Sequence, residues 1–242
     1  MQINQTAPAK RAGDIRFGVL PSTISLRIRE PGSAITHFIA FILLLAGTGP
    51  LLMQARTHGS WLTLLGVQVF LITSMMLYAA STVYHTVVLD RERTRVFKKI
   101  DHMMISVMIA GTYTPVCLTI LAGRTGIILL AAIWIMAFGG ILLKAFWITC
   151  PKWVSSVLYL VMGWLCVFAL VPLFELLPRS GFLWLLAGGI SYSVGALIYA
   201  LQLPLFNRRH KYFGSHEIFH LFIMGGTFCH YVFMIRYLVF FV

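Results

Sequence analysis

Charged side chains are scarce in this chain of 242 residues: only 11% are Asp, Glu, Lys or Arg, and 59% are hydrophobic. A soluble domain of this size carries roughly a quarter charged residues. The composition therefore excludes an ordinary soluble globular protein and predicts an integral membrane protein.

Acidic residues are rarer than basic ones, with seven Asp and Glu against 19 Lys and Arg, a formal net charge of +12. A basic surplus can mark a nucleic-acid-binding protein, but in a chain this apolar it favours contact with anionic headgroups at the membrane surface. We expect membrane lipids as partners, through basic loops facing the inner leaflet, and no nucleic acid.

Paired cysteines and a secretory signal are also lacking. The four cysteines have no CxxC spacing, which argues against a disulfide framework or a thiolate metal site, and we expect them to pack between helices. Residues 1–33 are polar and basic, and no small-residue cleavage site follows the first apolar run. We therefore expect no cleaved signal peptide.

Long apolar segments are abundant, and seven of them approach or exceed the length of about 20 residues that a membrane-spanning helix needs. They cover about residues 34–54, 61–88, 100–121, 125–146, 153–173, 182–203 and 216–241. The connections are short and contain Gly and Pro. The predicted fold is an all-α seven-transmembrane helix bundle, with a basic tail at 1–33 and one membrane domain at 34–242.

Basic residues predict the orientation of this bundle. Fifteen Lys and Arg fall in the N-terminal tail and in the connections after the second, fourth and sixth spans, and four fall on the other side. Because cytoplasmic loops are enriched in Lys and Arg, the N-terminus is expected in the cytoplasm and the C-terminus outside.

A cluster of histidines is expected at the cytoplasmic end of the bundle. His216 and His220 are four residues apart, so their rings lie on one helix face, about 6 Å apart along its axis, and can bind one metal ion. His85 lies near the end of the second span, at the same depth. Three imidazoles and a water would form a tetrahedral site that favours Zn²⁺, with other divalent metals as alternatives.

Only Asp101 and Glu217, of the seven acidic residues, fall where a carboxylate is expected to reach this metal, and either could deprotonate a bound water. Ser81, one turn before His85, could contact that water or a substrate. Plainer roles remain open. His85 could be a hydrogen-bonded interior histidine, Asp101 could cap the third span, and Glu217 could face water.

Two further histidines have no assigned role. His230 follows His220 by ten residues, about 15 Å deeper, which is too far for the same ion, so it is expected to be a hydrogen-bonded interior residue. His37 opens the first span on the cytoplasmic side and could lie behind the metal ligands.

Several of these motifs together resemble the bacterial hemolysin III family, which is related to the progestin and adipoQ receptors. The resemblance covers about residues 30–236. The motifs that carry it are Ser81-Thr82-Val83-Tyr84-His85, Asp101-His102 with Ala110-Gly111-Thr112-Tyr113-Thr114-Pro115, Met162-Gly163-Trp164, and His216-Glu217-Ile218-Phe219-His220 followed by His230. The chain departs from the family around His37. The next residue here is Phe38, whereas relatives often have Gly after this histidine.

The resemblance implies seven helices around a zinc ion in a bacterial inner membrane. By motif position the ligands would be His85, His216 and His220, Asp101 would hold the metal-bound water, and Ser81 would lie beside it. The wider superfamily includes ceramide-hydrolysing membrane enzymes, the eukaryotic relatives are receptors, and the family name refers to lysis.

Four functions follow as hypotheses. The first is a zinc-dependent hydrolase of a lipid amide or ester, with Asp101 as the base. The second is a non-enzymatic receptor or regulator of membrane state in which zinc is structural. The third is a pore-forming cytolysin, although no span has the polar stripe of a wide channel. The fourth is an intramembrane metalloprotease with Glu217 of the HExxH string as the base, a motif that is weak by itself.

Overall fold

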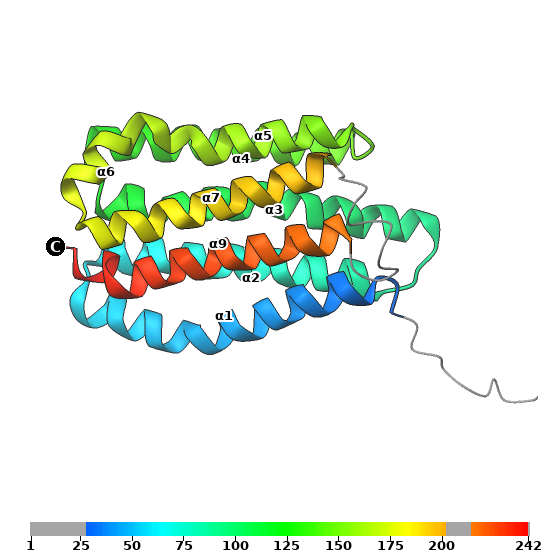
Figure 1. The fold of residues 1–242 in the computed structure, drawn as a ribbon, viewed down its shortest axis with the longest axis horizontal. Helices are drawn as coiled ribbons and strands as arrows, with labels where there is room; N and C mark the ends of the chain where they lie inside the picture. Colours follow the sequence, from blue (N-terminus) through cyan, green and yellow to red (C-terminus); the bar gives the residue numbers. More distant parts are fainter. Residues whose placement is uncertain (1–27, 202–213, 242) are drawn as a thin grey trace, which may run out of the picture.

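The computed structural model describes residues 28–201 and 214–241 (Figure 1). Within these ranges it contains seven helices that are long enough and apolar enough to cross a membrane. No strand occurs within these ranges. The helices are α1 (Pro31–His58), α2 (Trp61–Thr86), α3 (Arg91–Thr119), α4 (Arg124–Phe146), α5 (Lys152–Trp164) continued through η1 (Leu165–Ala169) into α6 (Leu170–Leu176), α7 (Arg179–Leu201), and α9 (Ser215–Arg236) followed by η2 (Leu238–Phe240). The predicted seven-helix fold is confirmed.

The helices form a closed ring. Each one packs against the next along the chain, α3 also contacts α5, and α9 returns to pack against α1. The start of α1 and the C-terminal end lie at opposite ends of the bundle (Figure 1). Because consecutive membrane-spanning helices alternate in direction, the starts of α1, α3 and α9 and the end of α2 lie at one end (Figure 1). The distribution of basic residues predicts that this end is cytoplasmic.

Helix α3 begins earlier than its apolar run suggests. The sequence predicted a span from about residue 100 and a loop before it, but the helix starts at Arg91, and the Asp90 carboxylate caps it by accepting a hydrogen bond from the Arg93 N–H at 2.8 Å. Hydropathy finds only the apolar part of a helix, whereas Arg, Glu and Lys are also good helix formers. Asp101 thus lies about three turns inside α3 and does not cap it.

The fifth span is interrupted between α5 and α6 by the 3₁₀ turn η1. The Tyr113 hydroxyl of α3 donates to the Gly163 carbonyl oxygen at 2.6 Å and accepts a hydrogen bond from the Cys166 N–H at 3.0 Å. Backbone groups released by the break thus find a partner inside the protein, as the hydrocarbon region requires.

Helices α2 and α3 approach closely through glycine. A Cβ atom added at Gly66 would lie 2.6 Å from the Pro115 Cα, and one added at Gly111 would lie 1.9 Å from the Thr73 Oγ1. Small residues allow such contact between membrane helices. Because the neighbour of Gly66 is backbone, it cannot rotate away from an added methyl group.

We expect Gly66→Ala to lower the melting temperature of the detergent-solubilised protein, since overpacking costs about 1–3 kcal/mol. Gly139→Ala in α4 is the matched control, because nothing lies within 4 Å of the added Cβ there. Thermal unfolding of both variants beside the wild type measures the effect, and equal melting temperatures for the two variants would contradict the close packing.

Candidate metal centre

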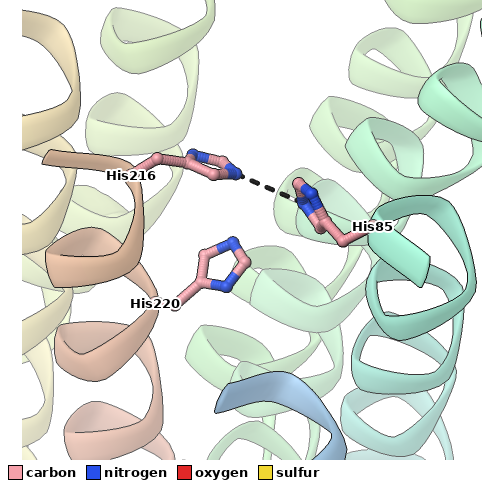
Figure 2. A group of neighbouring side chains, drawn as sticks. All are labelled: His85, His216 and His220. Carbon is pink, nitrogen blue, oxygen red and sulfur yellow. Dashed lines mark hydrogen bonds between the residues drawn. The ribbon is translucent and has the colours of Figure 1, made fainter. Parts of the chain in front are cut away.

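Three imidazoles from two helices meet at the expected cytoplasmic end of the bundle (Figure 2). His85 lies at the end of α2, and His216 and His220 lie in the first two turns of α9. One ring nitrogen of each lies within 4.8 Å of the others, and His85 and His220 are almost completely buried. The structure thus brings together the three histidines that the sequence placed at one depth.

The spacing of the ring nitrogens suits a tetrahedral ion. The Nε2 atoms of His85 and His216 are 3.2 Å apart. Two nitrogens that each bind a tetrahedral zinc at about 2.0–2.1 Å are about 3.3 Å apart. The His85–His216 pair therefore has the spacing of two ligands of one zinc ion, and a ring nitrogen of His220 lies within 4.8 Å of both.

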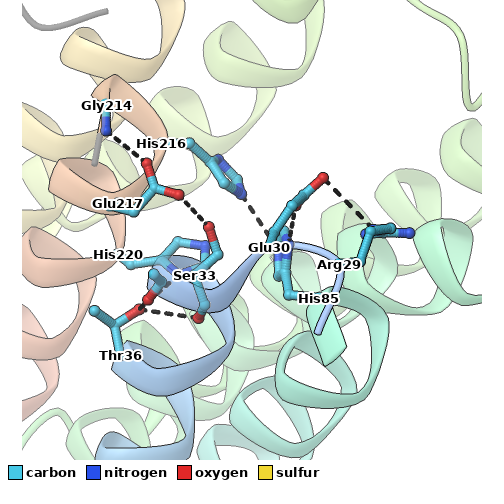
Figure 3. Close-up of polar contacts among 10 residues, drawn as sticks. Arg29, Glu30, Ser33, Thr36, His85, Gly214, His216, Glu217 and His220 are labelled. Carbon is cyan, nitrogen blue, oxygen red and sulfur yellow. Dashed lines mark hydrogen bonds and ion pairs between the residues drawn. The ribbon is translucent and has the colours of Figure 1, made fainter. Parts of the chain in front are cut away.

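The outer nitrogens of two of these rings have partners from the start of α1 (Figure 3). The Nδ1 of His85 pairs with the Glu30 carboxylate, and the Nδ1 of His220 lies 3.1 Å from the Thr36 Oγ1. The Thr36 hydroxyl donates to the Ser33 carbonyl oxygen at 2.9 Å, so it accepts from His220. With the proton on Nδ1, each Nε2 keeps its lone pair for a metal, as is usual for histidine ligands.

Glu30 is a site residue that the sequence interpretation missed, because it lies outside the apolar spans. Residues 29 and 30 run along the end of α2, where the Glu30 N–H donates to the His85 carbonyl oxygen at 3.0 Å. The hydrogen bond to His85 holds the pKa of the Glu30 carboxyl below its usual value, so Glu30 is an anion beside the imidazole. Helix α1 begins at Pro31, within the expected tail, of which residues 1–27 lie outside the described part of the chain.

Glu217 caps a helix in the structure, whereas the sequence suggested that it could act as a base at the metal. Its carboxylate accepts hydrogen bonds from the Gly214 N–H at 2.8 Å and from the Ser33 hydroxyl at 2.6 Å. It therefore caps the start of α9 and ties it to α1 (Figure 3). With both oxygens engaged in this way, Glu217 is poorly suited to act as a base at the histidines.

Asp101 and Ser81 are both buried and line one cavity together with His37, His216 and His220. Asp101 projects from the middle of a helix, which removes the plainer role of a helix cap. The Ser81 hydroxyl lies beside the Asp101 carboxylate and interacts with it. The two side chains thus belong to the polar end of the cavity, beside the histidines.

The rest of this cavity is mainly apolar and extends far into the bundle between α3, α5, α7 and α9. Its lining along α3 runs from Asp101 through Ile105, Met108 and Thr112 to Val116, about 22 Å along the helix axis. The chain therefore encloses a slot with a polar end at the histidines and an apolar body.

His37 and His230 are two of the other histidines that line this slot. The His37 ring stacks on the His220 ring, with centroids 3.6 Å apart, so His37 packs directly behind one of the three histidines. His230 lines the cavity farther along α9, and its Nε2 lies 3.3 Å from the Leu185 carbonyl oxygen. His230 is thus a hydrogen-bonded interior residue, as its position in the sequence predicted.

Comparison with known proteins agrees with the motifs. The family model "Haemolysin-III related" matches residues 26–231. Hemolysin-3 of Bacillus cereus is 39% identical over 198 residues, which are 82% of this chain and 86% of that protein. A hemolysin-3 homolog of Bacillus subtilis (strain 168) is 36% identical over 198 residues, 82% of this chain and 89% of the other.

A more distant similarity covers a short segment. The adiponectin receptor protein of Drosophila melanogaster is 38% identical over 61 residues, 24% of this chain and 14% of the receptor. No solved structure matches. The chain belongs to the haemolysin III family of multi-pass membrane proteins.

Removing the charge of Glu30 tests whether its carboxylate supports His85 as a metal ligand. We expect Glu30→Gln to weaken metal binding by about 10-fold or more, because outer partners of histidine ligands typically contribute 10–100-fold in affinity. Glu92→Gln is the matched control, since that carboxylate is exposed in the first turn of α3. Competition with a chromogenic chelator measures both affinities, and an equal loss in the two variants would contradict the assignment.

Proposed function

We propose that this protein is a zinc-dependent intramembrane hydrolase that cleaves an amide or ester bond of a membrane lipid. The observation that carries the proposal is the cavity. Its polar end is lined by a buried carboxylate and by His216 and His220, two of the three converging imidazoles, and its body is mainly apolar. A membrane lipid likewise has a polar linkage at one end and an apolar acyl chain beyond it, so its shape and polarity match those of the cavity.

The donor set favours zinc. Three neutral imidazoles with an open fourth position are typical of catalytic zinc sites. A zinc ion bound by His85, His216 and His220 would polarise a substrate carbonyl and lower the pKa of a water.

Asp101 is proposed to act as the general base. It is the carboxylate that lines the cavity beside the histidines, whereas Glu30 is bonded to His85 and Glu217 caps α9. From this position its carboxylate can accept a proton from a water at the polar end of the slot. The Ser81 hydroxyl, buried at the same end, can orient that water or the carbonyl oxygen of the substrate.

The apolar body of the slot would hold the acyl chain. Side chains along α3 continue the lining from Asp101 to Val116, so a chain laid in the slot presents its polar linkage to the histidines. The basic connections at this end suggest that the lipid enters from the cytoplasmic leaflet.

A non-enzymatic role with structural zinc is the second candidate. The three histidines belong to α2 and α9, which are far apart in the sequence, so a shared ion would tie the last helix to the second. A receptor or regulator could need such a tie without chemistry. The two candidates differ in whether Asp101 has a function.

The names of the Bacillus relatives suggest cytolysis as a third candidate. A lytic pore needs a continuous water-filled path, whereas the cavity described here has mainly apolar walls. We therefore favour a sealed bilayer over leakage, and release of a trapped dye from liposomes that contain the purified protein distinguishes the two.

Asp101→Asn separates the hydrolase from the structural candidate. We expect the variant to bind zinc and unfold at the same temperature as the wild type, but to release fatty acid at least about 100-fold more slowly, since general bases contribute about 10²–10⁴-fold. The assay is mass spectrometry of fatty acids released by protein in nanodiscs of a bacterial total lipid extract. Glu217→Gln is the control and should keep most of the activity.

Two results would contradict the hydrolase. One is undiminished fatty acid release by Asp101→Asn. The other is no release at all by wild type that carries zinc.

A further inference from the structure

Lys144 is a buried cation with no anionic partner in the described part of the chain. It lies in the last turn of α4, yet its exposure is only 3%. Lysines near the ends of membrane helices usually extend to the headgroups and stay exposed. Lys144 instead turns into the bundle and lines the cavity.

The groups that touch the Lys144 ammonium are neutral. Its Nζ donates to the Ser155 hydroxyl oxygen and lies 3.2 Å from the Cys150 sulfur. The ion pairs among the described residues involve Glu30 and Asp90, and none involves Lys144. A buried charge without a counter-charge is strongly unfavourable, so an ammonium kept at this position indicates an anion supplied from outside the chain.

Other polar groups surround the same part of the cavity. Ser155 and Ser156, both buried, come from the first two turns of α5, near the helix N-terminus, where the helix dipole also favours an anion. The Nδ1 of His102 is buried without a hydrogen-bond partner among the described residues, and His102 also lines the cavity. An ammonium, two hydroxyls and an imidazole offer more donors than the two oxygens of a carboxylate need, and they match the oxygens of a phosphate.

The same cavity continues into the apolar slot along α3, and Lys152 lies over the Tyr199 ring on its wall, 4.8 Å from the centroid. A ligand bound here therefore meets positive charge at one end and hydrocarbon at the other. We propose that Lys144, with Ser155, Ser156 and His102, forms a binding site for the phosphate headgroup of an acyl lipid whose chain occupies the slot. This site would bind its lipid whether or not the histidines are catalytic.

Three single-chain lipids with the same oleoyl chain test the proposal: 1-oleoyl lysophosphatidic acid, oleic acid and 1-oleoylglycerol. Native mass spectrometry of the full-length protein in detergent measures the affinity for each. We expect the wild type to bind the phosphate lipid at least about 10-fold more tightly than the uncharged one, the size of a charge-assisted hydrogen bond, and more tightly than oleate.

Lys144→Met should reduce this preference to about threefold or less, because the ammonium is the charge that distinguishes the headgroups. Arg95→Met is the matched control: it removes one positive charge from an exposed position on α3 at the same end, and should keep the preference. Should Lys144→Met fail to fold, Ser156→Ala, a smaller change, is expected to lower affinity for the phosphate lipid by about threefold.

Several outcomes would overturn the proposal. They are a wild type without preference for the phosphate lipid, oleate binding as tight as that of the phosphate lipid, or full preference in a folded Lys144→Met. Because the experiment reads binding alone, a protein that binds the phosphate lipid but never cleaves one supports this site while contradicting the hydrolase.

Discussion

The start of α1 supplies the contacts on which the histidine centre depends. Glu30 and Thr36 bond the outer nitrogens of His85 and His220, and Ser33 bonds the Glu217 cap of α9. Imidazoles buried in an apolar bundle would otherwise be free to take either tautomer and several ring orientations. Contacts from one short segment thus fix two rings on two other helices, so the geometry of the centre requires α1 to be docked between α2 and α9.

Closure of the helix ring explains how this segment comes into place. The last helix returns to the first, and α3 continues as a helix through the polar residues before Asp101. Asp101, His102 and Lys144 thereby reach the cavity at its histidine end, while mainly apolar residues line the rest. A polar end and an apolar body within one cavity suit a lipid better than a soluble substrate or an ion.

The sequence was most informative where the signal is local. Apolar runs predicted seven helices, and the four-residue spacing of His216 and His220 predicted rings on one face. His85 was included in the predicted site only because the predicted orientation and span lengths place it at the same depth in the membrane as His216 and His220. The segment from Arg91 to Lys99 was misread as a loop, because hydropathy does not detect a polar helix.

Contacts between distant segments could not be predicted in this way. Glu30 meets His85 across 55 positions, in a stretch that looks like a polar tail. Glu217 resembled a catalytic base in the HExxH string, and only the positions of Gly214 and Ser33 show that it is a cap. The inward direction of Lys144 likewise depends on α5 packing beside α4, which no local pattern in either helix indicates.

Metal content is the most direct test of the central claim that His85, His216 and His220 bind one zinc ion. Elemental mass spectrometry should be applied to detergent-purified wild type, His220→Ala and His58→Ala, the last removing a histidine that packs on Phe240 at the other end of α1. The account predicts about one zinc per chain in the wild type and in His58→Ala, and none in His220→Ala. A folded wild type without metal, or a His220→Ala variant that keeps its zinc, would contradict it.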